Sequence, residues 1–426
     1  MTRSITRFLA ALLLIGFGLG KAAAIETPYI VVDMGSGKVL AQRNPYQLWY
    51  PASITKLMNA YVVFKALKQG RITLDTQVVV SRHALDEPPS KMGFKVGTVI
   101  NLDNALKMML VHSSNDIAMA IAETVGGSEE GFVAMMNAEA AGLGMTSSHF
   151  INPNGLPGPG QHTTARDLAV LAQALWTEYP EKRPLFGISA IRSGNKVMKS
   201  ANTLLERYRG TVGMKTGFIC SSGFNVVAVA TRNGRTLAAV VLGSQNAKDR
   251  AELAGRLFNQ GFGMLSLPGQ RPTLANSRGS SPIPDVIDMR DEGVCKKKDR
   301  GENEADADKI DDVVTASALE PRFKLMEPVT VTTLGIRKAD GSVGVATAAD
   351  TQDDPPAVKS PKKPKATKKS TESKPKKAAV SKETKASAPA AAPKPQAKAA
   401  PKLEVGVPFE STDIAPLPDM PAPATQ

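Results

Sequence analysis

The chain has 426 residues, a formal net charge of +13 and two cysteines. Its length allows two or three domains with a well-buried core, and two cysteines are too few for a small disulfide-stapled scaffold. The basic excess is local, because residues 359–402 hold 14 lysines against 2 glutamates and the rest is nearly neutral. Cys220 and Cys295 are expected to be free thiols, although an oxidising compartment would allow a disulfide.

Residues 1–24 have the pattern of a secretory signal peptide. Two arginines precede an apolar run of 12 residues, Phe8 to Leu19, and the three alanines at 22–24 suit a signal peptidase. A membrane anchor is the weaker alternative, because a spanning helix needs about 20 apolar residues. We therefore expect export to the periplasm or the outer face of the cytoplasmic membrane, which argues against nucleic acid as a partner.

Residues 25–268 carry dense signals of regular structure and are expected to form the catalytic domain. Runs at 29–33 and 39–41 predict two strands, and the runs 223–230 and 236–243 are joined through Asn233-Gly234, a hairpin signature. Helical periodicity between and after them predicts helices at 52–70, 103–110, 116–125, 129–141, 165–177 and 247–258. This order predicts a mixed α/β (α+β) fold, with an antiparallel sheet built from distant segments and a helical lobe.

The structural signals weaken after residue 268. Residues 269–352 are polar, with one strand-like run at 329–333, and residues 353–426 are rich in Lys, Pro and Ala. Such a composition cannot bury enough apolar surface to fold. We therefore expect 270–426 to be mostly disordered, apart from a small element near 326–337.

Ser53 and Lys56 form an S-x-x-K motif at the start of a predicted amphipathic helix. Positions i and i+3 share a helix face, so the lysine amine can reach the serine hydroxyl. A hydroxyl is a poor nucleophile until a base takes its proton, and lysine can be that base when burial and nearby positive charge lower its pKa. The same pattern at 193–196 fits a turn between two strands, and those at 360–363 and 373–376 lie in the Lys-rich tail.

Two further motifs follow in the chain. Ser113 and Asn115 form an S-x-N triplet before a predicted helix, where a simple helix cap is the alternative interpretation of Ser113. Lys215, Thr216 and Gly217 form a K-T-G triplet beside the paired strands near the end of the domain. A lysine and a threonine on a strand can hold a substrate carboxylate, and glycine lets a substrate backbone approach closely.

The three motifs together resemble those of the low-molecular-mass penicillin-binding proteins, the D-alanyl-D-alanine carboxypeptidases. S-x-x-K, an S-D-N-type triplet and K-T-G form a known set in β-lactamases and penicillin-binding proteins. The likeness covers about residues 27–265, and it is strongest in the stretches 51–58, 114–118, 160–169 and 213–217. Residues 152–161 contain no acidic residue, whereas a β-lactamase normally carries a glutamate in that loop.

The resemblance implies a β-lactamase/transpeptidase-like fold, in which a five-stranded antiparallel sheet is flanked by helices beside a helical lobe. It implies Ser53 as the acylated nucleophile, Lys56 as its proton acceptor and Ser113 as the proton relay to the leaving D-alanine. The implied substrate-binding residues are Asn115, Lys215, Thr216 and Gly217. The implied oxyanion hole consists of the backbone N–H groups of Ser53 and Phe218, although relatives often have histidine at the latter position.

The activity implied by the resemblance is removal of the terminal D-alanine from peptidoglycan stem peptides, with β-lactams as covalent inhibitors and no metal or other cofactor. The four histidines, His83, His112, His149 and His162, show no zinc-ligand spacing, which argues against a metallopeptidase.

Two alternatives remain: a DD-endopeptidase on wall cross-links and a weakly catalytic peptidoglycan-binding protein. The Lys-rich tail is expected either to contact anionic envelope surfaces or to be a solvated spacer.

Overall fold

The structure is a computed structural model that describes residues 26–264, 271–295, 317–323, 327–338 and 340–344. The predicted signal peptide and the predicted Lys-rich tail both lie outside the described residues. Among the described residues, none of the helices combines the length and the apolar character that crossing a bilayer requires.

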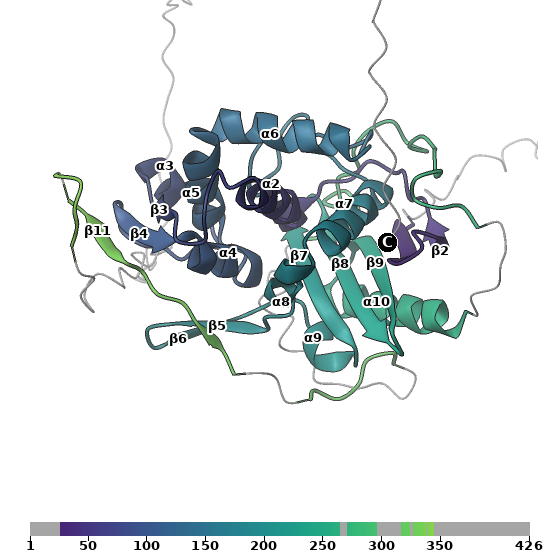
Figure 1. Ribbon diagram of the computed structural model, residues 1–426. Coiled ribbons are helices and arrows are strands. Elements are labelled where there is room, and N and C mark those ends of the chain that lie inside the picture. The colour runs from purple at the N-terminus through teal and green to yellow at the C-terminus, as the bar shows by residue number, and fades with distance from the viewer. Residues whose placement is uncertain (1–25, 265–270, 296–316, 324–326, 339, 345–426) are drawn as a thin grey trace, which may run out of the picture. The chain divides into compact units, whose positions relative to one another are not determined.

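A five-stranded antiparallel sheet lies at the centre of the described chain (Figure 1). Its order is β2 (Val39–Arg43), β1 (Tyr29–Asp33), β9 (Arg235–Ser244), β8 (Gly223–Arg232) and β7 (Thr211–Ile219). Strand β1 pairs with β9, so the two ends of the domain meet in one sheet, and β7 is an edge strand. The prediction of an antiparallel sheet assembled from distant segments is confirmed.

Both faces of this sheet are covered by helices. The side chains of β9 alternate, so that positions 238, 240 and 242 belong to the core that contains α7 (Ala165–Glu178), whereas 237, 239 and 241 pack with α10 (Ala247–Gly263). This is the period of two that an extended strand imposes. A strand covered on both sides needs apolar residues at nearly every position, which explains the continuous apolar run in β9.

The helices predicted at 103–110, 116–125, 129–141 and 165–177 are present, each longer by one residue at one or both ends, as α4 (Leu102–Val111), α5 (Asn115–Gly126), α6 (Glu129–Gly142) and α7. Thr164 caps α7 and accepts a hydrogen bond from Asp167 N at 3.1 Å. The expected hairpin turn joins β8 to β9, with Asn233 and Gly234 both at positive φ. Such a turn matches the right-handed twist of the paired strands.

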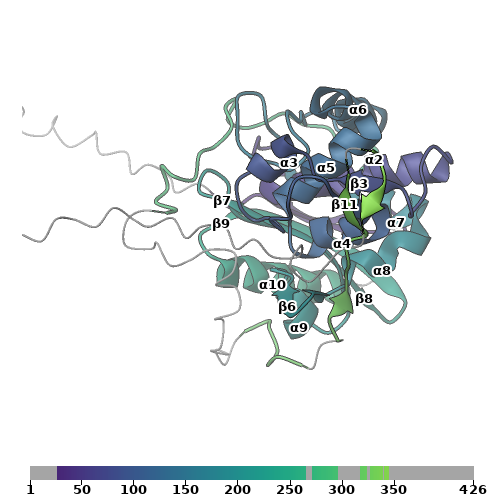
Figure 2. The ribbon, with the colours of Figure 1, turned by 90° about the vertical axis from the view of Figure 1, so that its left-hand side faces the viewer.

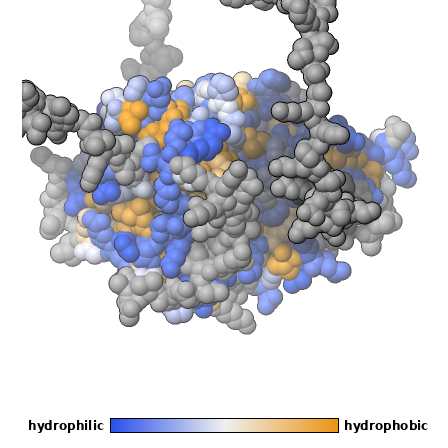
Figure 3. All heavy atoms as spheres, turned by 180° about the vertical axis from the view of Figure 1, so that it is seen from behind, coloured by the Kyte–Doolittle hydropathy of each residue, from blue (hydrophilic) through white to orange (hydrophobic). Residues whose placement is uncertain are grey.

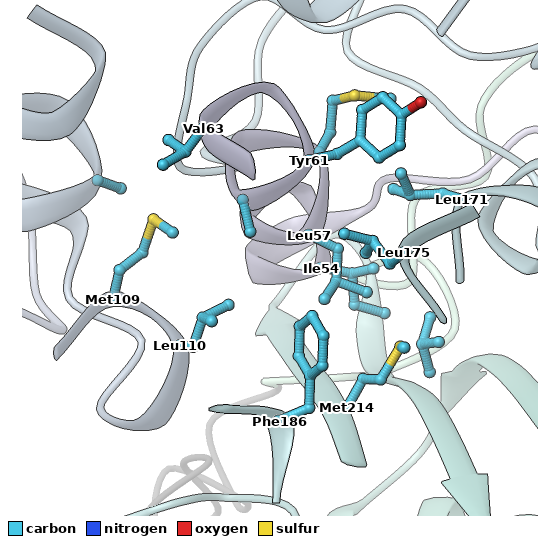
Figure 4. Close-up of a cluster of buried hydrophobic side chains, with 14 of the residues drawn as sticks. Ile54, Leu57, Tyr61, Val63, Met109, Leu110, Leu171, Leu175, Phe186 and Met214 are labelled. Atoms are coloured by element: carbon cyan, nitrogen blue, oxygen red, sulfur yellow. The ribbon is translucent and has the colours of Figure 1, made fainter. Parts of the chain in front are cut away.

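The 3₁₀ turn η1 (Ala52–Thr55) leads directly into the central helix α2 (Lys56–Lys68). The prediction that this helix is amphipathic is wrong, because nearly all of its residues from Lys56 to Ala66 are buried. Figure 4 shows the reason: Leu57 lies near Leu175 of α7, while Val63 on another side of the helix lies towards Met109 of α4. A helix between the sheet and the helical lobe is enclosed on all sides.

Two smaller sheets flank the centre. Strands β5 (Ala190–Ser193) and β6 (Lys196–Lys199) form the hairpin expected there, and β10 (Val329–Thr330) adds to β5 in parallel. The second sheet contains β3 (Gln77–Val79), β4 (Thr98–Asn101), β11 (Gly335–Arg337) and β12 (Val343–Gly344). The remaining short helices are α3 (Arg82–Asp86), η2 (Pro180–Lys182), α8 (Arg183–Phe186) and α9 (Leu204–Arg207).

The prediction of mostly disordered chain beyond residue 269 is wrong for residues 271–295. This segment is irregular, but it buries Leu274, Ile287, Met289 and Val294 against the domain. Isolated apolar residues in an irregular segment give no periodic signal in the sequence, because each fills a separate gap in the packing. The strand predicted at 329–333 is shorter in the structure, because β10 ends at Thr330. The next strand, β11, begins at Gly335.

The expectation of free thiols is also wrong, because Cys220 and Cys295 form a disulfide with their Cα atoms 5.7 Å apart. The two residues are 75 positions apart in the chain, so only the path of 271–295 back to the end of β7 brings them together.

Seen from behind the view of Figure 1, the coloured surface of the described residues is a mosaic of hydrophilic and hydrophobic patches (Figure 3). The large apolar side chains lie mainly in the buried clusters around α2 and beneath α10.

Candidate active site

Ser53 lies in η1, which packs against the edge strand β7. Gly217 of β7 allows this contact, since a Cβ added there would lie only 3.0 Å from the backbone nitrogens of Ser53 and Ile54. From the sequence, this glycine is expected to let a substrate backbone approach the strand. The structure shows that it admits the turn that carries Ser53.

Lys56 is fully buried, and its Nζ contacts three oxygens: Ser53 Oγ at 3.0 Å, Asn115 Oδ1 at 2.7 Å and the backbone oxygen of Asn154 at 2.9 Å. The two amide oxygens can only accept hydrogen bonds, whereas the serine hydroxyl can also donate. A neutral amine has two N–H groups and one lone pair. When it donates to both amides, the lone pair faces the Ser53 hydroxyl, which is the arrangement that proton abstraction needs.

Lys215 and Ser113 form a second lysine–serine pair. Lys215 Nζ donates to Ser113 Oγ at 3.0 Å and to the backbone oxygen of Thr216 at 2.9 Å. Ser113 has a φ of 63°, a left-handed conformation that non-glycine residues seldom adopt and that is frequent at functional sites. The alternative interpretation of Ser113 as a helix cap is wrong, because Ser114 is the N-cap residue of α5.

A cavity of about 760 Å³ joins the motifs. Of the predicted site residues, it is lined by Ser53, Ser113, Asn115, Lys215 and Phe218. Strand β6 and the loop at 154–156 form further walls. Lys56 contacts Ser53 from within the fold, and Thr216 and Gly217 do not line the cavity, although both lie on the strand that borders it.

Several residues that the sequence reasoning missed support this site. Asn154 offers its backbone oxygen to Lys56, and Asn225 Nδ2 donates to the backbone oxygen of Tyr50 at 3.0 Å, just before η1. The Asn154-Gly155 pair is a turn signal. It predicts a loop, but the sequence does not reveal that the backbone oxygen of Asn154 accepts a hydrogen bond from Lys56, because every residue has a backbone oxygen.

His112 is the histidine that lines the cavity. Burial, together with the positive charges of Lys196 and Lys215, lowers the pKa of His112 to about 4, so its imidazole is neutral at neutral pH. His149 and His162 stack on each other away from the cavity lining, and His83 pairs with Glu123 and Glu129.

Asp116 follows Asn115 and holds the loop at the cavity rim. Its carboxylate accepts hydrogen bonds from the backbone N–H groups of Met92 at 3.1 Å and Gly93 at 2.8 Å. Burial raises the pKa of Asp116, while these backbone donors favour its charged form.

Comparison with known proteins identifies a family and several relatives that this chain resembles. The profile of a family described as D-alanyl-D-alanine carboxypeptidase matches residues 21–246. The chain is 37% identical over 247 residues to D-alanyl-D-alanine carboxypeptidase DacC of Escherichia coli K12, a match that covers 55% of this chain and 60% of that protein. It is 36% identical over 240 residues to DacD of the same strain, covering 55% and 62%. The match thus spans about three fifths of these relatives' length.

Solved structures show the same fold. Penicillin-binding protein 5 from Haemophilus influenzae has a TM-score of 0.54 at 31% identity, covering 57% of this chain and 73% of that one. Penicillin-binding protein 6B from Escherichia coli has a TM-score of 0.53 at 34% identity, covering 55% and 76%. Penicillin-binding protein D2 from Listeria monocytogenes, solved in a cefotaxime-bound form, has a TM-score of 0.51 at 26% identity, covering 55% and 96%.

These likenesses confirm the expected fold, and the family profile extends over more than half of the chain. Within that matched region, the serine–lysine pairs of the three motifs gather around one cavity. The chain therefore belongs to the D-alanyl-D-alanine carboxypeptidase family of serine peptidases.

Proposed function

We propose that this chain removes the terminal D-alanine from peptidoglycan stem peptides through an acyl-enzyme at Ser53, and that penicillins acylate the same residue. The observation that carries the proposal is the 3.0 Å contact between Ser53 Oγ and the buried Lys56 Nζ, beside a cavity that also holds the Ser113–Lys215 pair. The names of the relatives support the substrate class, and the cefotaxime-bound relative supports acylation by β-lactams.

In the acylation step, Ser53 Oγ attacks the carbonyl carbon of the penultimate D-alanine while Lys56 Nζ takes the hydroxyl proton. The negative charge on the carbonyl oxygen is stabilised by the backbone N–H groups of Ser53 and Phe218. Ser113 then relays the proton that Lys56 took to the nitrogen of the terminal D-alanine, which leaves Lys56 neutral again and Ser113 as a hydroxyl, and Lys215 holds Ser113 in place for this transfer. The C–N bond breaks, D-alanine leaves, and the peptide remains as an ester on Ser53.

In the deacylation step, water attacks the ester carbonyl while Lys56 accepts a proton from it. The C–O bond to Ser53 breaks, the shortened peptide leaves as a carboxylate, and Ser53 regains its proton. Lys215 and Thr216 bind the carboxylate of the incoming substrate, and Asn115 binds its amide. Gly217 keeps β7 against the catalytic turn during this cycle.

Labelling with a fluorescent penicillin tests the proposal. We expect covalent labelling of the wild type, no labelling of Ser53→Ala, and normal labelling of Ser193→Ala, whose serine stands in an unrelated S-x-x-K sequence. Release of D-alanine from a pentapeptide then establishes the carboxypeptidase reaction. Cleavage of cross-linked dimers without D-alanine release would instead identify an endopeptidase. Binding of peptide with neither reaction would identify a wall-binding protein.

The setting of the reaction is part of the same proposal. Residues 25–268 form the catalytic domain of an exported protein, and the trimming of stem peptides in the periplasm limits cross-linking and so affects wall growth and cell shape. The lysines of 359–402 tether the chain to anionic envelope surfaces. Deletion of 355–405 is expected to abolish binding to envelope fractions, and high salt is expected to release the full-length chain. Salt-insensitive retention would contradict tethering by charge.

A further inference from the structure

The two amide oxygens that contact Lys56 are held in place by one short segment, residues 87–90. Asn115 Nδ2 donates to the backbone oxygen of Pro88 at 2.9 Å, and Asn115 N donates to the backbone oxygen of Ser90 at 2.7 Å. Asn154 Nδ2 donates to Glu87 Oε2 at 2.9 Å. Two of the three acceptors in 87–90 are backbone oxygens, whereas the contact of Glu87 depends on its side chain.

Asn154 is buried in a loop that presses on the catalytic turn. Its side-chain oxygen accepts from Leu156 N at 3.1 Å, and Asn152 Oδ1 accepts from Gly155 N at 2.8 Å. Gly155 has a φ of 94°, and a Cβ there would collide with the backbone oxygen of Ala52, the residue before Ser53. The loop therefore has little freedom. Asn59 Nδ2 and Lys56 Nζ donate to its backbone oxygens at Pro153 and Asn154, at 3.3 and 2.9 Å, and Glu87 holds the side-chain amide of Asn154.

We propose that Glu87 is a positioning residue, which acts through Asn154 to orient the Lys56 amine towards Ser53. The connection is continuous: Glu87 Oε2 accepts from the Asn154 amide, and the Asn154 backbone oxygen accepts from Lys56 Nζ. If Asn154 shifts, Lys56 loses one of the two amide acceptors that direct its lone pair at the Ser53 hydroxyl. This inference rests on the proposed function of Ser53 and Lys56 and adds a residue outside the three motifs.

Glu87 also influences the charge of this site. The groups that interact with it electrostatically are Lys56 of α2, His83 of α3 and Glu129 of α6. Burial raises the pKa of Glu87, while the Asn154 hydrogen bond and the positive charges oppose that rise. An ionised Glu87 favours the protonated form of Lys56, so it raises the pH at which Lys56 becomes a competent base.

The hydrogen bond of Glu87 to Asn154 and its charge can be tested separately, because one variant keeps the acceptor oxygen and removes only the charge. Glu87→Gln retains an oxygen for the Asn154 amide, whereas Glu87→Ala removes both the oxygen and the charge. A displacement of the reacting groups by about 1 Å can cost on the order of 100-fold in rate, so we expect Glu87→Ala to slow acylation by about 10- to 100-fold. Glu87→Gln is expected to stay within about 3-fold of the wild type at its pH optimum, with the acidic limb of its profile displaced to lower pH.

The measurement is the second-order rate constant of acylation by a fluorescent penicillin across pH, for the full chain and its variants. Asn154→Ala is expected to slow acylation as Glu87→Ala does, and the double variant is expected to be no slower than either single variant, because both break one connection. Glu129→Gln is the matched control: it removes a neighbouring carboxylate that does not contact Asn154, and we expect an acylation rate close to that of the wild type. Thermal unfolding of each variant checks the fold.

The outcomes distinguish this inference from the proposed function. An unlabelled wild type would overturn the proposed function itself. A labelled wild type with Glu87→Ala acylated at the same rate would overturn the role of Glu87, as would losses that add up in the double variant or an equal loss in Glu129→Gln. If Glu87→Ala does not fold, Asn154→Ala decides, because it removes the amide group that Glu87 contacts, and an acylation rate equal to that of the wild type would contradict the proposal.

Discussion

Two adjacent serines, Ser113 and Ser114, have different partners although they follow each other in the chain. Ser113 Oγ accepts from Lys215 Nζ at the cavity, whereas Ser114 Oγ donates to the backbone oxygen of Met108 at 3.1 Å inside the fold. The positive φ of Ser113 turns its side chain away from the helix start, which leaves Ser114 as the N-cap. One backbone conformation thus separates a candidate proton relay from a structural hydroxyl.

We predict that Ser113→Ala lowers D-alanine release and penicillin acylation by about 10²- to 10⁴-fold, the range for loss of a proton-transfer group. Ser114→Ala is expected to cost about 1 kcal/mol of unfolding free energy, the usual contribution of one hydrogen bond, and to leave acylation near the wild-type rate. Acylation kinetics and denaturant unfolding of both variants check this pair. Equal acylation rates for Ser113→Ala and Ser114→Ala would contradict it.

His112 makes the free energy of unfolding depend on pH. Its pKa is lowered from 6.5 to about 4 in the folded state, so between these values the unfolded chain binds a proton at His112 that the folded chain does not. The free energy of unfolding therefore falls as the pH falls through this window, and the His112 contribution is fully present above pH 6.5. We expect His112→Gln to show a shallower loss of stability between pH 6.5 and 4 in denaturant titrations, and identical slopes would show that His112 is not the group responsible.

Among the elements, the loop 152–156 packs closely against the turn η1, and Gly155 makes this close packing possible. Gly155 needs a positive φ and has no space for a Cβ beside Ala52, whereas Gly144 after α6 has a positive φ of 71° with open space around it. Alanine at Gly144 would therefore introduce backbone strain alone, whereas alanine at Gly155 would add a steric clash with Ala52. This comparison also tests whether the loop supports Ser53.

We predict that Gly144→Ala costs about 1 kcal/mol, the left-handed strain alone, whereas Gly155→Ala costs about 2–4 kcal/mol because overpacking adds to it. Gly155→Ala is also expected to slow penicillin acylation, since it displaces the residue before Ser53. Denaturant unfolding and acylation rates measure both effects. A Gly155→Ala variant as stable and as fast as Gly144→Ala would mean that the loop yields without moving η1.

At the scale of the whole described chain, segments beyond residue 268 return to the domain and bind it together. Val331 N donates to the backbone oxygen of Arg192 in β5 at 2.9 Å, and Leu334 N donates to that of Val99 in β4 at 2.7 Å. Figure 2 shows β11 on the helical side of the molecule, where it pairs with β4. The segment 327–338 therefore connects the hairpin that forms a wall of the cavity with the small sheet of the helical lobe.

The Cys220–Cys295 disulfide is the covalent part of this arrangement. It fastens the end of 271–295 beside Phe218 and Ile219, which line the cavity, and Met289 N donates to the backbone oxygen of Ser221 at 3.0 Å. We predict that the double variant Cys220→Ser/Cys295→Ser loses about 2–5 kcal/mol of unfolding free energy. Unfolding with and without dithiothreitol checks the cause, because the wild type should respond to the reductant and the double variant should not. An unchanged wild type in dithiothreitol would contradict a stabilising bridge.

Local patterns predicted much of the domain. Alternating and periodic apolar residues placed most strands and helices, Asn233-Gly234 placed the hairpin turn, and Thr164 with Asp167 placed the start of α7, since these signals act within a few residues. The three motifs likewise identified Ser53, Lys56, Ser113 and Lys215, because the chemistry of a serine nucleophile limits which residue types can serve.

The sequence by itself therefore determined the fold class and the residue types that the reaction needs. Only the tertiary structure decided the burial of α2 on all sides, the packing of 271–295, the Cys220–Cys295 disulfide and the hydrogen bonds of Asn154 with Lys56 and Glu87. These features depend on contacts between segments far apart in the chain or on backbone oxygens. Neither leaves a periodic or compositional trace, because the free energy of such contacts arises only once the chain has folded.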